Sequence, residues 1–307
     1  MTTNAIQQPL EAQARPATVV SPARAFYWAV RRELCESRSI YLAPLGVGAL
    51  FLLGYVVSAV PLPQKMRAGM ALGPMKHHEA LMTPYDIAAG LMMITMMIVG
   101  TFYCLDALYG ERRDRSILFW KSLPVSDTTT VLAKASIPFV ALPFLAFAVG
   151  VLTQLVVLLL SGSGLGGSGQ SVASLWTQLS FPRMAVLLFY HMLMMHVLWH
   201  APFYAWFLLV GAWVRRSPFV WGFLVPIALC FLEKIVFNTT HFLDMIRYRL
   251  NGNGMDVLLT QAHFVIDPMT QMTPLRYLSS PGLWIGLAFT AVFIAAAVQL
   301  RRFRGPM

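Results

Sequence analysis

The sequence predicts an all-α polytopic membrane protein with six transmembrane helices. Of its 307 residues, 57% are hydrophobic and only 12% are charged, whereas soluble domains carry about 25% charged residues. Six apolar stretches are long enough to span a bilayer, which takes about 20 helical residues. They lie near residues 40–60, 85–108, 131–160, 183–214, 218–237 and 281–300. A transmembrane β-barrel is excluded because its strands alternate in segments of about 10 residues, and these runs are continuous.

The distribution of charge predicts that both chain termini are cytoplasmic. The chain has 23 Lys and Arg residues and a net charge of +10. With both ends inside, most of the basic residues fall before the first span, after the second and fourth spans, and in the C-terminal tail. Cytoplasmic segments carry such an excess. Because the Arg clusters flank spans, we assign them to membrane lipid and expect no nucleic acid partner.

The N-terminal region divides into a tail and a helix. Residues 1–22 are polar and contain proline, so we expect a disordered tail. Residues 23–39 place apolar side chains at helical spacing among several arginines, which predicts an interfacial helix along the inner leaflet. A basic flank of the first span is the alternative. Residues 23–304 are expected to form a single transmembrane domain.

Proline and chain length shape the prediction for the later segments. The stretch 183–214 would be about 48 Å long as a helix and contains Pro202, so we expect one long helix with a kink. Splitting it would give seven spans and move the basic C-terminal tail outside. The region 238–280 is the largest outer loop, and His241–Leu250 predicts a short amphipathic helix that stops at Gly252.

The segment 109–130, between the second and third spans, combines charge with apolar residues. It begins with the charged cluster Glu111, Arg112, Arg113, Asp114 and Arg115. The apolar residues Ile117, Phe119 and Trp120 follow, and Pro124 ends the turn before Ser126, which caps the next helix. Arg and Trp are favoured anchors of protein interfaces, so this charged and apolar segment predicts a docking site for a cytoplasmic partner. The alternative is a basic loop whose aromatic rings rest at the lipid headgroups.

This segment resembles the cytoplasmic loop of type-2 ATP-binding-cassette (ABC) transporter permeases, and it is similar to one bacterial subgroup of them. The likeness is carried by the run Glu111–Asp127, ERRDRSILFWKSLPVSD, and reaches from about residue 24 to residue 304. Gly110 departs from the pattern, because glycine is a weak helix former. Shorter matches are Arg32-Glu33, Glu36-Ser37-Arg38-Ser39, Leu232-Glu233-Lys234 and Thr273-Pro274-Leu275-Arg276-Tyr277-Leu278.

The resemblance implies a six-span exporter subunit in a bacterial inner membrane. Such a subunit would form a homodimer or a heterodimer and bind two copies of a separate ABC ATPase. The segment 23–39 would be its connecting helix. The coupling residues would be Glu111, Arg112, Arg113, Asp114, Arg115, Ile117, Phe119, Trp120 and Pro124.

The chain itself is not expected to be an enzyme. It lacks the Gly-x-x-x-x-Gly-Lys-Ser/Thr pattern whose backbone amides cradle phosphates. We therefore expect no cofactor on this chain, with ATP and Mg²⁺ bound by the partner ATPase.

Two other functions stay open from the sequence: a histidine-metal integral membrane enzyme and an ion-driven carrier. His196 and His200 are four residues apart and share a helix face, whereas His191 lies on the opposite face from His200, so one helix supplies at most two ligands and we expect no metal. A carrier would need acidic groups at the midplane, and Glu233 comes nearest. We expect Glu233, His196 and His200 to line a translocation path.

Overall fold

The computed structural model describes residues 21–59, 74–122, 125–162, 172–251, 275 and 278–304. All regular elements in these ranges are helices. Six helices are long and apolar enough to cross a membrane, namely Ser39–Ser58, Leu81–Arg113, Asp127–Gly162, Phe181–Trp199, Pro218–Phe237 and Pro281–Phe303. The predicted all-α fold with six helices apolar enough to span a membrane is confirmed, and the chain is a multi-pass membrane protein. Nearly all of the predicted tail 1–22, and residues 252–274 of the predicted outer loop, lie outside the described residues.

The segment predicted as an amphipathic helix forms α1 (Pro22–Glu36), which is separated from α2 (Ser39–Ala59) by a short break. The Ser21 hydroxyl accepts a hydrogen bond from Arg24 N and so caps α1. On one face of α1, Val30 and Leu34 pack against the core. Tyr27 and Trp28, earlier in the same helix, are exposed. The placement of α1 along the inner leaflet stays a prediction.

The second and third spans are longer than the sequence predicts. Helix α4 (Pro74–Arg113) extends beyond 85–108 at both ends, and Gly110 lies inside it without ending it. The third span combines α6 (Asp127–Ser136), the π-helical turn η1 (Ile137–Ala141) and α7 (Leu142–Gly162). Because Pro138 has no N–H group, a regular α-helix would lose a hydrogen bond there, and the wider π turn accommodates that loss.

The prediction of one kinked helix over 183–214 is wrong, because the chain breaks at His200, where φ is −86° and ψ is 2°. After α8 (Val172–Leu179) come α9 (Phe181–His191), the π-helical stretch η2 (Met192–Trp199) and α10 (Ala201–Trp213). Pro202 cannot donate an N–H to the carbonyl of Leu198, so the α-helical hydrogen bonding cannot continue through this point. Helices α9, η2 and α10 still follow one another from α8 to the end of α4, where Arg112 Nη1 donates to Ala212 O.

Helix α10 lies at the centre of the helix packing and contacts α4 and α15 (Pro281–Phe303). Gly211 permits the close approach to α4, since a Cβ atom at this position would lie only 2.7 Å from the carbonyl oxygen of Leu105 and 3.1 Å from that of Cys104. Small residues at helix contacts serve this purpose in membrane proteins generally.

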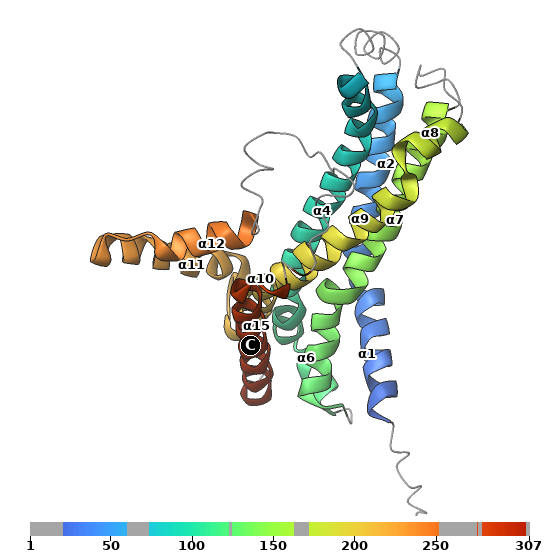
Figure 1. Ribbon diagram of the computed structural model, residues 1–307. Helices are drawn as coiled ribbons and strands as arrows, with labels where there is room; N and C mark the ends of the chain where they lie inside the picture. Colours follow the sequence, from blue (N-terminus) through green and yellow to red (C-terminus); the bar gives the residue numbers. More distant parts are fainter. Residues whose placement is uncertain are drawn as a thin grey trace, which may run out of the picture.

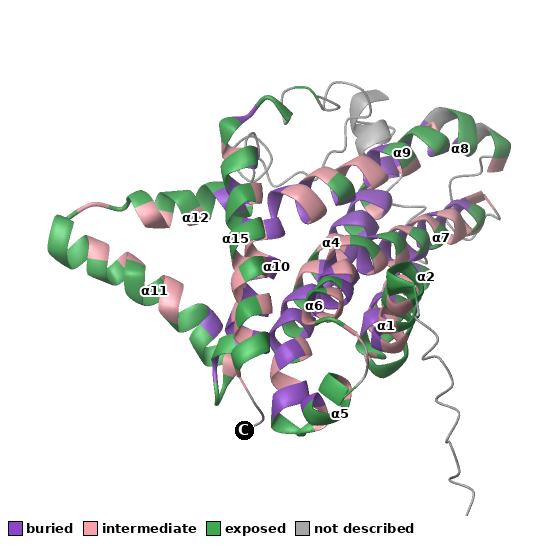
Figure 2. Ribbon diagram, turned by 90° about the horizontal axis from the view of Figure 1, so that it is seen from below, coloured by how far each residue is buried: buried purple, intermediate pink, exposed green. Residues whose placement is uncertain are grey.

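Helices α11 (Pro218–Phe237) and α12 (His241–Asn251) project together to one side of the other helices (Figure 1). Only the first turns of α11 are attached: Gly222 packs against Leu105 and Phe207, and its carbonyl accepts a 3.0 Å hydrogen bond from Trp206 Nε1. Most of the remaining side chains of α11 are exposed, as the green ribbon in Figure 2 shows. The far end of α12 returns to the body, where Arg249 Nη1 donates to Trp199 O at 3.2 Å and Arg249 Nη2 donates to Gly282 O.

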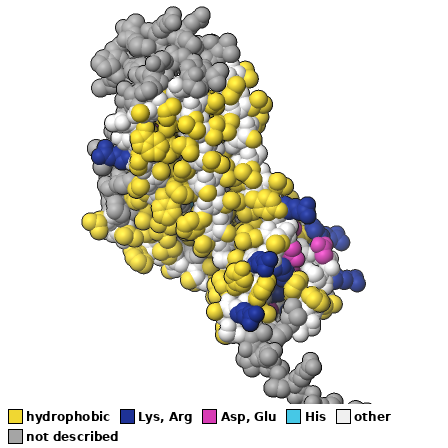
Figure 3. All heavy atoms as spheres, turned by 90° about the vertical axis from the view of Figure 1, so that its right-hand side faces the viewer, with side chains coloured by type: hydrophobic (Ala, Val, Ile, Leu, Met, Phe, Trp, Pro, Cys, Tyr) yellow, Lys and Arg dark blue, Asp and Glu magenta, His cyan; other side chains and the backbone are white. Residues whose placement is uncertain are grey.

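The structure gathers basic residues that the sequence assigns to the cytoplasm at one end, here called the basic end. Lys121 Nζ donates to the carbonyls of Arg302 at 3.3 Å and Arg304 at 3.4 Å, which joins the segment after α4 to the end of α15. On the face shown in Figure 3, most blue Lys and Arg side chains lie near the lower end, below a broad yellow apolar surface. The side of a bilayer that the basic end faces stays a prediction.

Candidate functional site

The most unusual feature of the basic end is a set of charged side chains buried between four helices. Glu33 of α1, Glu111 of α4, Lys134 of α6 and Arg301 of α15 are each no more than 6% exposed. Acidic and basic residues are almost never so buried unless they are paired. We call these four residues the buried charge network.

The network contains two acids and two bases, and its members pair with one another. Lys134 Nζ lies 2.8 Å from Glu33 Oε1 and 3.2 Å from Glu111 Oε1. Arg301 Nη1 pairs with Glu111 Oε2. The Tyr103 hydroxyl donates a 2.9 Å hydrogen bond to Glu33 Oε2. Because opposite charges balance, no formal net charge is left within the four residues.

The local structure brings these side chains together at one level. Glu33 lies in the last turns of α1, Glu111 in the last turn of α4 and Lys134 near the end of α6. Helix α6 starts where the sequence predicts, since the Ser126 hydroxyl accepts a 3.1 Å hydrogen bond from Thr129 N. Asp127 follows this cap and forms a 3.1 Å ion pair with Arg301 Nε, so it connects the network to partly exposed surface.

Arg32 connects the network to the short helix that follows α4. Its Nη2 atom lies 3.0 Å from Glu111 Oε1, and its Nε atom lies 3.1 Å from Glu36 Oε2. The guanidinium carbon lies 3.5 Å from the ring centroid of Trp120, in a cation–π contact. Trp120 belongs to α5 (Ser116–Ser122), so α5 is attached to α1 through this arginine.

Helix α5 presents an apolar surface at the basic end. Arg115, with a φ of 58°, makes the turn that separates α4 from α5. Ile117 is buried, whereas Leu118 and Phe119 are 57% and 60% exposed. The ring of Phe119 meets that of Trp120 edge to face, with centroids 4.9 Å apart. One side of α5 therefore packs against the protein, and the other side exposes apolar side chains.

The structure divides the predicted coupling residues between the interior and the surface. Glu111 and Arg112 lie in the last turn of α4 and are buried. Arg113 and Asp114 form an exposed pair at 2.9 Å, and the hydrogen bond from Arg113 lowers the pKa of the Asp114 carboxyl. Pro124 lies outside the described residues.

Arg112 has a structural partner that the sequence does not reveal. Its Nη1 atom donates to Ala212 O at 2.5 Å and to Val214 O at 3.2 Å. These carbonyls lie at the C-terminal end of α10, where helical acceptors lack partners and a positive charge is favourable. Arg112 therefore joins the end of α4 to the end of α10.

The three residues predicted to line a translocation path are not brought together as one site. His196 and His200 do meet, as the shared helix face predicts, with ring centroids 5.2 Å apart, and both are buried. His200 Nδ1 lies 2.6 Å from Met195 O. The carboxylate of Glu233, by contrast, is bound to the start of α12. Within the described residues, no group of three or more His, Cys, Asp or Glu side chains could hold a metal ion.

Glu233 acts as a cap for α12. It accepts hydrogen bonds of 2.8 Å from His241 N and from Phe242 N, and one of 2.7 Å from the Thr239 hydroxyl. Replacing Glu233 with Ala should therefore leave the first amides of α12 without acceptors. We expect faster amide hydrogen exchange across His241–Asn251, measured by mass spectrometry. Unchanged exchange in α12 would contradict this role, and α4 serves as the internal control.

The roles of Lys134, Asp127 and Arg301 in this network were not predicted from the sequence. One signal was present: Lys134 lies inside the apolar run 131–160, and an ionisable residue in such a run calls for a partner. The partner could not be identified from spacing, because Glu33 is 101 residues away along the chain.

The chain matches no protein-family model, no curated protein and no solved structure in the comparisons made.

Proposed function

We propose that this protein is the transmembrane subunit of an ATP-driven ABC exporter, coupled through α5 to a separate ATPase. The observation that carries the proposal is the attachment of α5 to the buried charge network. An apolar surface at the basic end is connected through Arg32 and Glu111 to α1, α4, α6 and α15. A displacement of α5 would therefore act on three apolar spans and on α1 together.

In the proposed cycle, two ATPase subunits bind at the α5 surfaces of two permease chains. ATP-driven closure of the ATPase pair would push α5, and the network would pass that movement to α4, α6 and α15. The spans would then alternate between inward and outward access. The resemblance of Glu111–Asp127 to ABC permease loops supports this assignment. The bacterial inner membrane, cytoplasmic termini and a homodimer or heterodimer belong to the same proposal.

The test is co-purification with a candidate ABC ATPase from the same genome. We expect the wild-type chain to retain the ATPase and Phe119→Glu to weaken retention about thirtyfold, since buried aromatic anchors dominate interfaces of this kind. Met245→Glu on α12 is the matched control, because Met245 is also exposed and lies far from α5 in the chain. Equal retention by Phe119→Glu and the control, or no retention by the wild-type chain, would contradict the proposal.

A further inference from the structure

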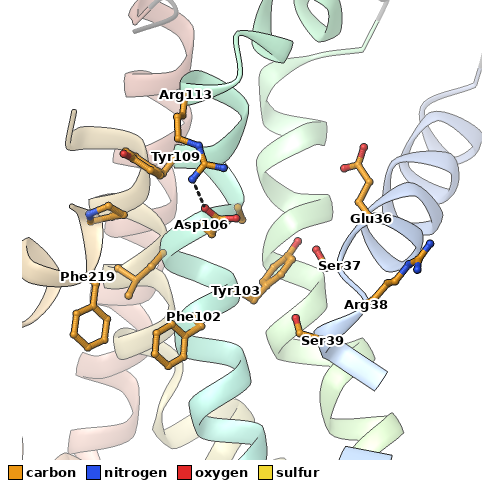
Figure 4. A pocket seen from close by; sticks show the side chains of 13 residues that line it. Glu36, Ser37, Arg38, Ser39, Phe102, Tyr103, Asp106, Tyr109, Arg113 and Phe219 are labelled. Carbon is orange, nitrogen blue, oxygen red and sulfur yellow. Dashed lines mark ion pairs between the residues drawn. The ribbon is translucent and has the colours of Figure 1, made fainter. Parts of the chain in front are cut away.

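An open groove of about 580 Å³ lies beside the buried charge network, between the α1–α2 junction, α4 and the start of α11 (Figure 4). Its walls change in character along α4. Arg113, Tyr109, Asp106 and Phe102 line it at spacings of four, three and four residues, which places them on one helix face. Polar and charged groups lie near the end of α4, and Phe102 lies about 16 Å deeper along the axis.

The deep part of the groove is apolar and contributed by two spans. Phe102 of α4 stacks on Phe219 of α11, with ring centroids 5.5 Å apart and planes at 6°. Leu105, which is buried, also lines the groove. Both phenylalanines are about half exposed, so the surface they form is available to an apolar chain.

The rim of the groove carries balanced charge. Arg38 and Arg113 are its cations, and Glu36 and Asp106 are its anions. Glu36 is also paired with Arg32, and Arg113 with Asp114. Ser37 and Ser39 add hydroxyl groups at the break between α1 and α2. Within the described residues, the charged partner of Asp106 is Arg113, at a long distance of 4.0 Å, and the Asp106 side chain is 67% exposed (Figure 4). A carboxylate so placed can accept a hydrogen bond from an ammonium group.

We propose that this groove binds one phospholipid with a zwitterionic, amine-bearing headgroup. The headgroup lies at the rim, with its phosphate beside the arginines and serines and its ammonium beside Asp106. One acyl chain lies along Leu105, Phe102 and Phe219. A zwitterionic headgroup fits better than an anionic one, because the rim charges balance and the exposed Asp106 carboxylate can accept a hydrogen bond from an ammonium group. A whole lipid fits better than a free phosphate compound, because the groove continues into an apolar floor.

Native mass spectrometry of the purified chain in detergent tests the groove, with dioleoyl phosphatidylethanolamine as the probe. Ala107 lines the groove, so Ala107→Trp should fill it. We expect the wild-type chain to retain one lipid and Ala107→Trp to lower that bound fraction at least fivefold. Ala291→Trp, at an exposed position of α15 outside the groove, should bind like the wild-type chain. Equal binding by the two tryptophan variants would overturn the proposal.

A second variant tests which lipid headgroup the groove prefers. It changes an exposed side chain and so does not disturb the packing. Asp106→Lys, at an exposed position, should lower the preference for phosphatidylethanolamine over phosphatidylglycerol about fivefold. Asp244→Lys, an exposed site on α12, should leave that preference unchanged. An unchanged preference in Asp106→Lys would overturn the headgroup assignment. Displacement of the lipid by millimolar glycerophosphoethanolamine would overturn the role of the apolar floor.

Discussion

Replacing Glu111 with Ala is expected to lower the free energy of unfolding by about 3 to 5 kcal/mol, because it leaves buried bases without their acid. Lys134 would keep Glu33 as a partner, but Arg301 would keep only the partly exposed Asp127. The measurement is chemical unfolding of the purified chain in detergent micelles. The neighbouring exposed pair supplies the control: Asp114→Ala should cause no measurable change, since surface ion pairs contribute little.

The double variant Glu111→Met with Arg301→Met tests whether the loss of stability comes from a buried charge left without a partner. It removes one acid and one base, so the remaining Glu33–Lys134 pair stays balanced. Replacing a whole buried ion pair by apolar residues is often neutral, and we expect the double variant to recover most of the stability lost in Glu111→Ala. A double variant as unstable as Glu111→Ala would contradict the pairing explanation.

Replacing Gly211 with Val should disrupt the contact between α10 and α4. The new side chain would begin 2.7 Å from Leu105 O and 3.1 Å from Cys104 O, and backbone atoms cannot move aside as a flexible side chain can. Overpacking of this kind costs about 1 to 3 kcal/mol or more. Displacement of α10 would also weaken the hydrogen bonds from Arg112 to Ala212 O and Val214 O. The same unfolding measurement checks the expected loss.

Gly46→Val is the matched control for this change. Gly46 also lies inside an apolar helix, but a Cβ atom there would have no neighbour within 4 Å. We expect no loss of stability in Gly46→Val. If the two valine variants behave alike, the close approach of α10 to α4 is not what Gly211 provides.

Much of the fold could be predicted because lipid imposes a simple requirement on sequence. A span needs about 20 apolar residues, and the predicted runs 40–60, 218–237 and 281–300 match α2, α11 and α15 closely. The break at His200 was not predicted. Pro202 indicated a distortion, but whether a proline bends or divides a helix depends on neighbours that accept or donate the freed hydrogen bonds. Here Arg249, 50 residues away, donates to Trp199 O.

The candidate site could be predicted only in part, for a related reason. The unusual composition of 109–130 was visible in the sequence, but the burial of Glu111 and Arg112 was not. A charged run predicts a solvated surface when it is considered alone. The partners of Glu111 are Arg32, Lys134 and Arg301. They lie before the first span, after the next turn and near the C-terminus, far from Glu111 in the sequence. Such pairing follows from tertiary packing, which no local pattern encodes.

The projecting helices α11 and α12 provide a place where movement of the other helices could be measured. Viewed from the basic end, α11 and α12 form two sides of a triangle whose apex lies at their junction (Figure 2). The two helices are attached to the rest of the protein at two points. At the first, Gly222 packs against α4 and α10, and at the second, Arg249 donates hydrogen bonds to Trp199 O and Gly282 O. A change in the distance between these two attachment points would move the junction of α11 and α12. A spectroscopic label near Thr239 would therefore report a change in the separation between these two attachment points.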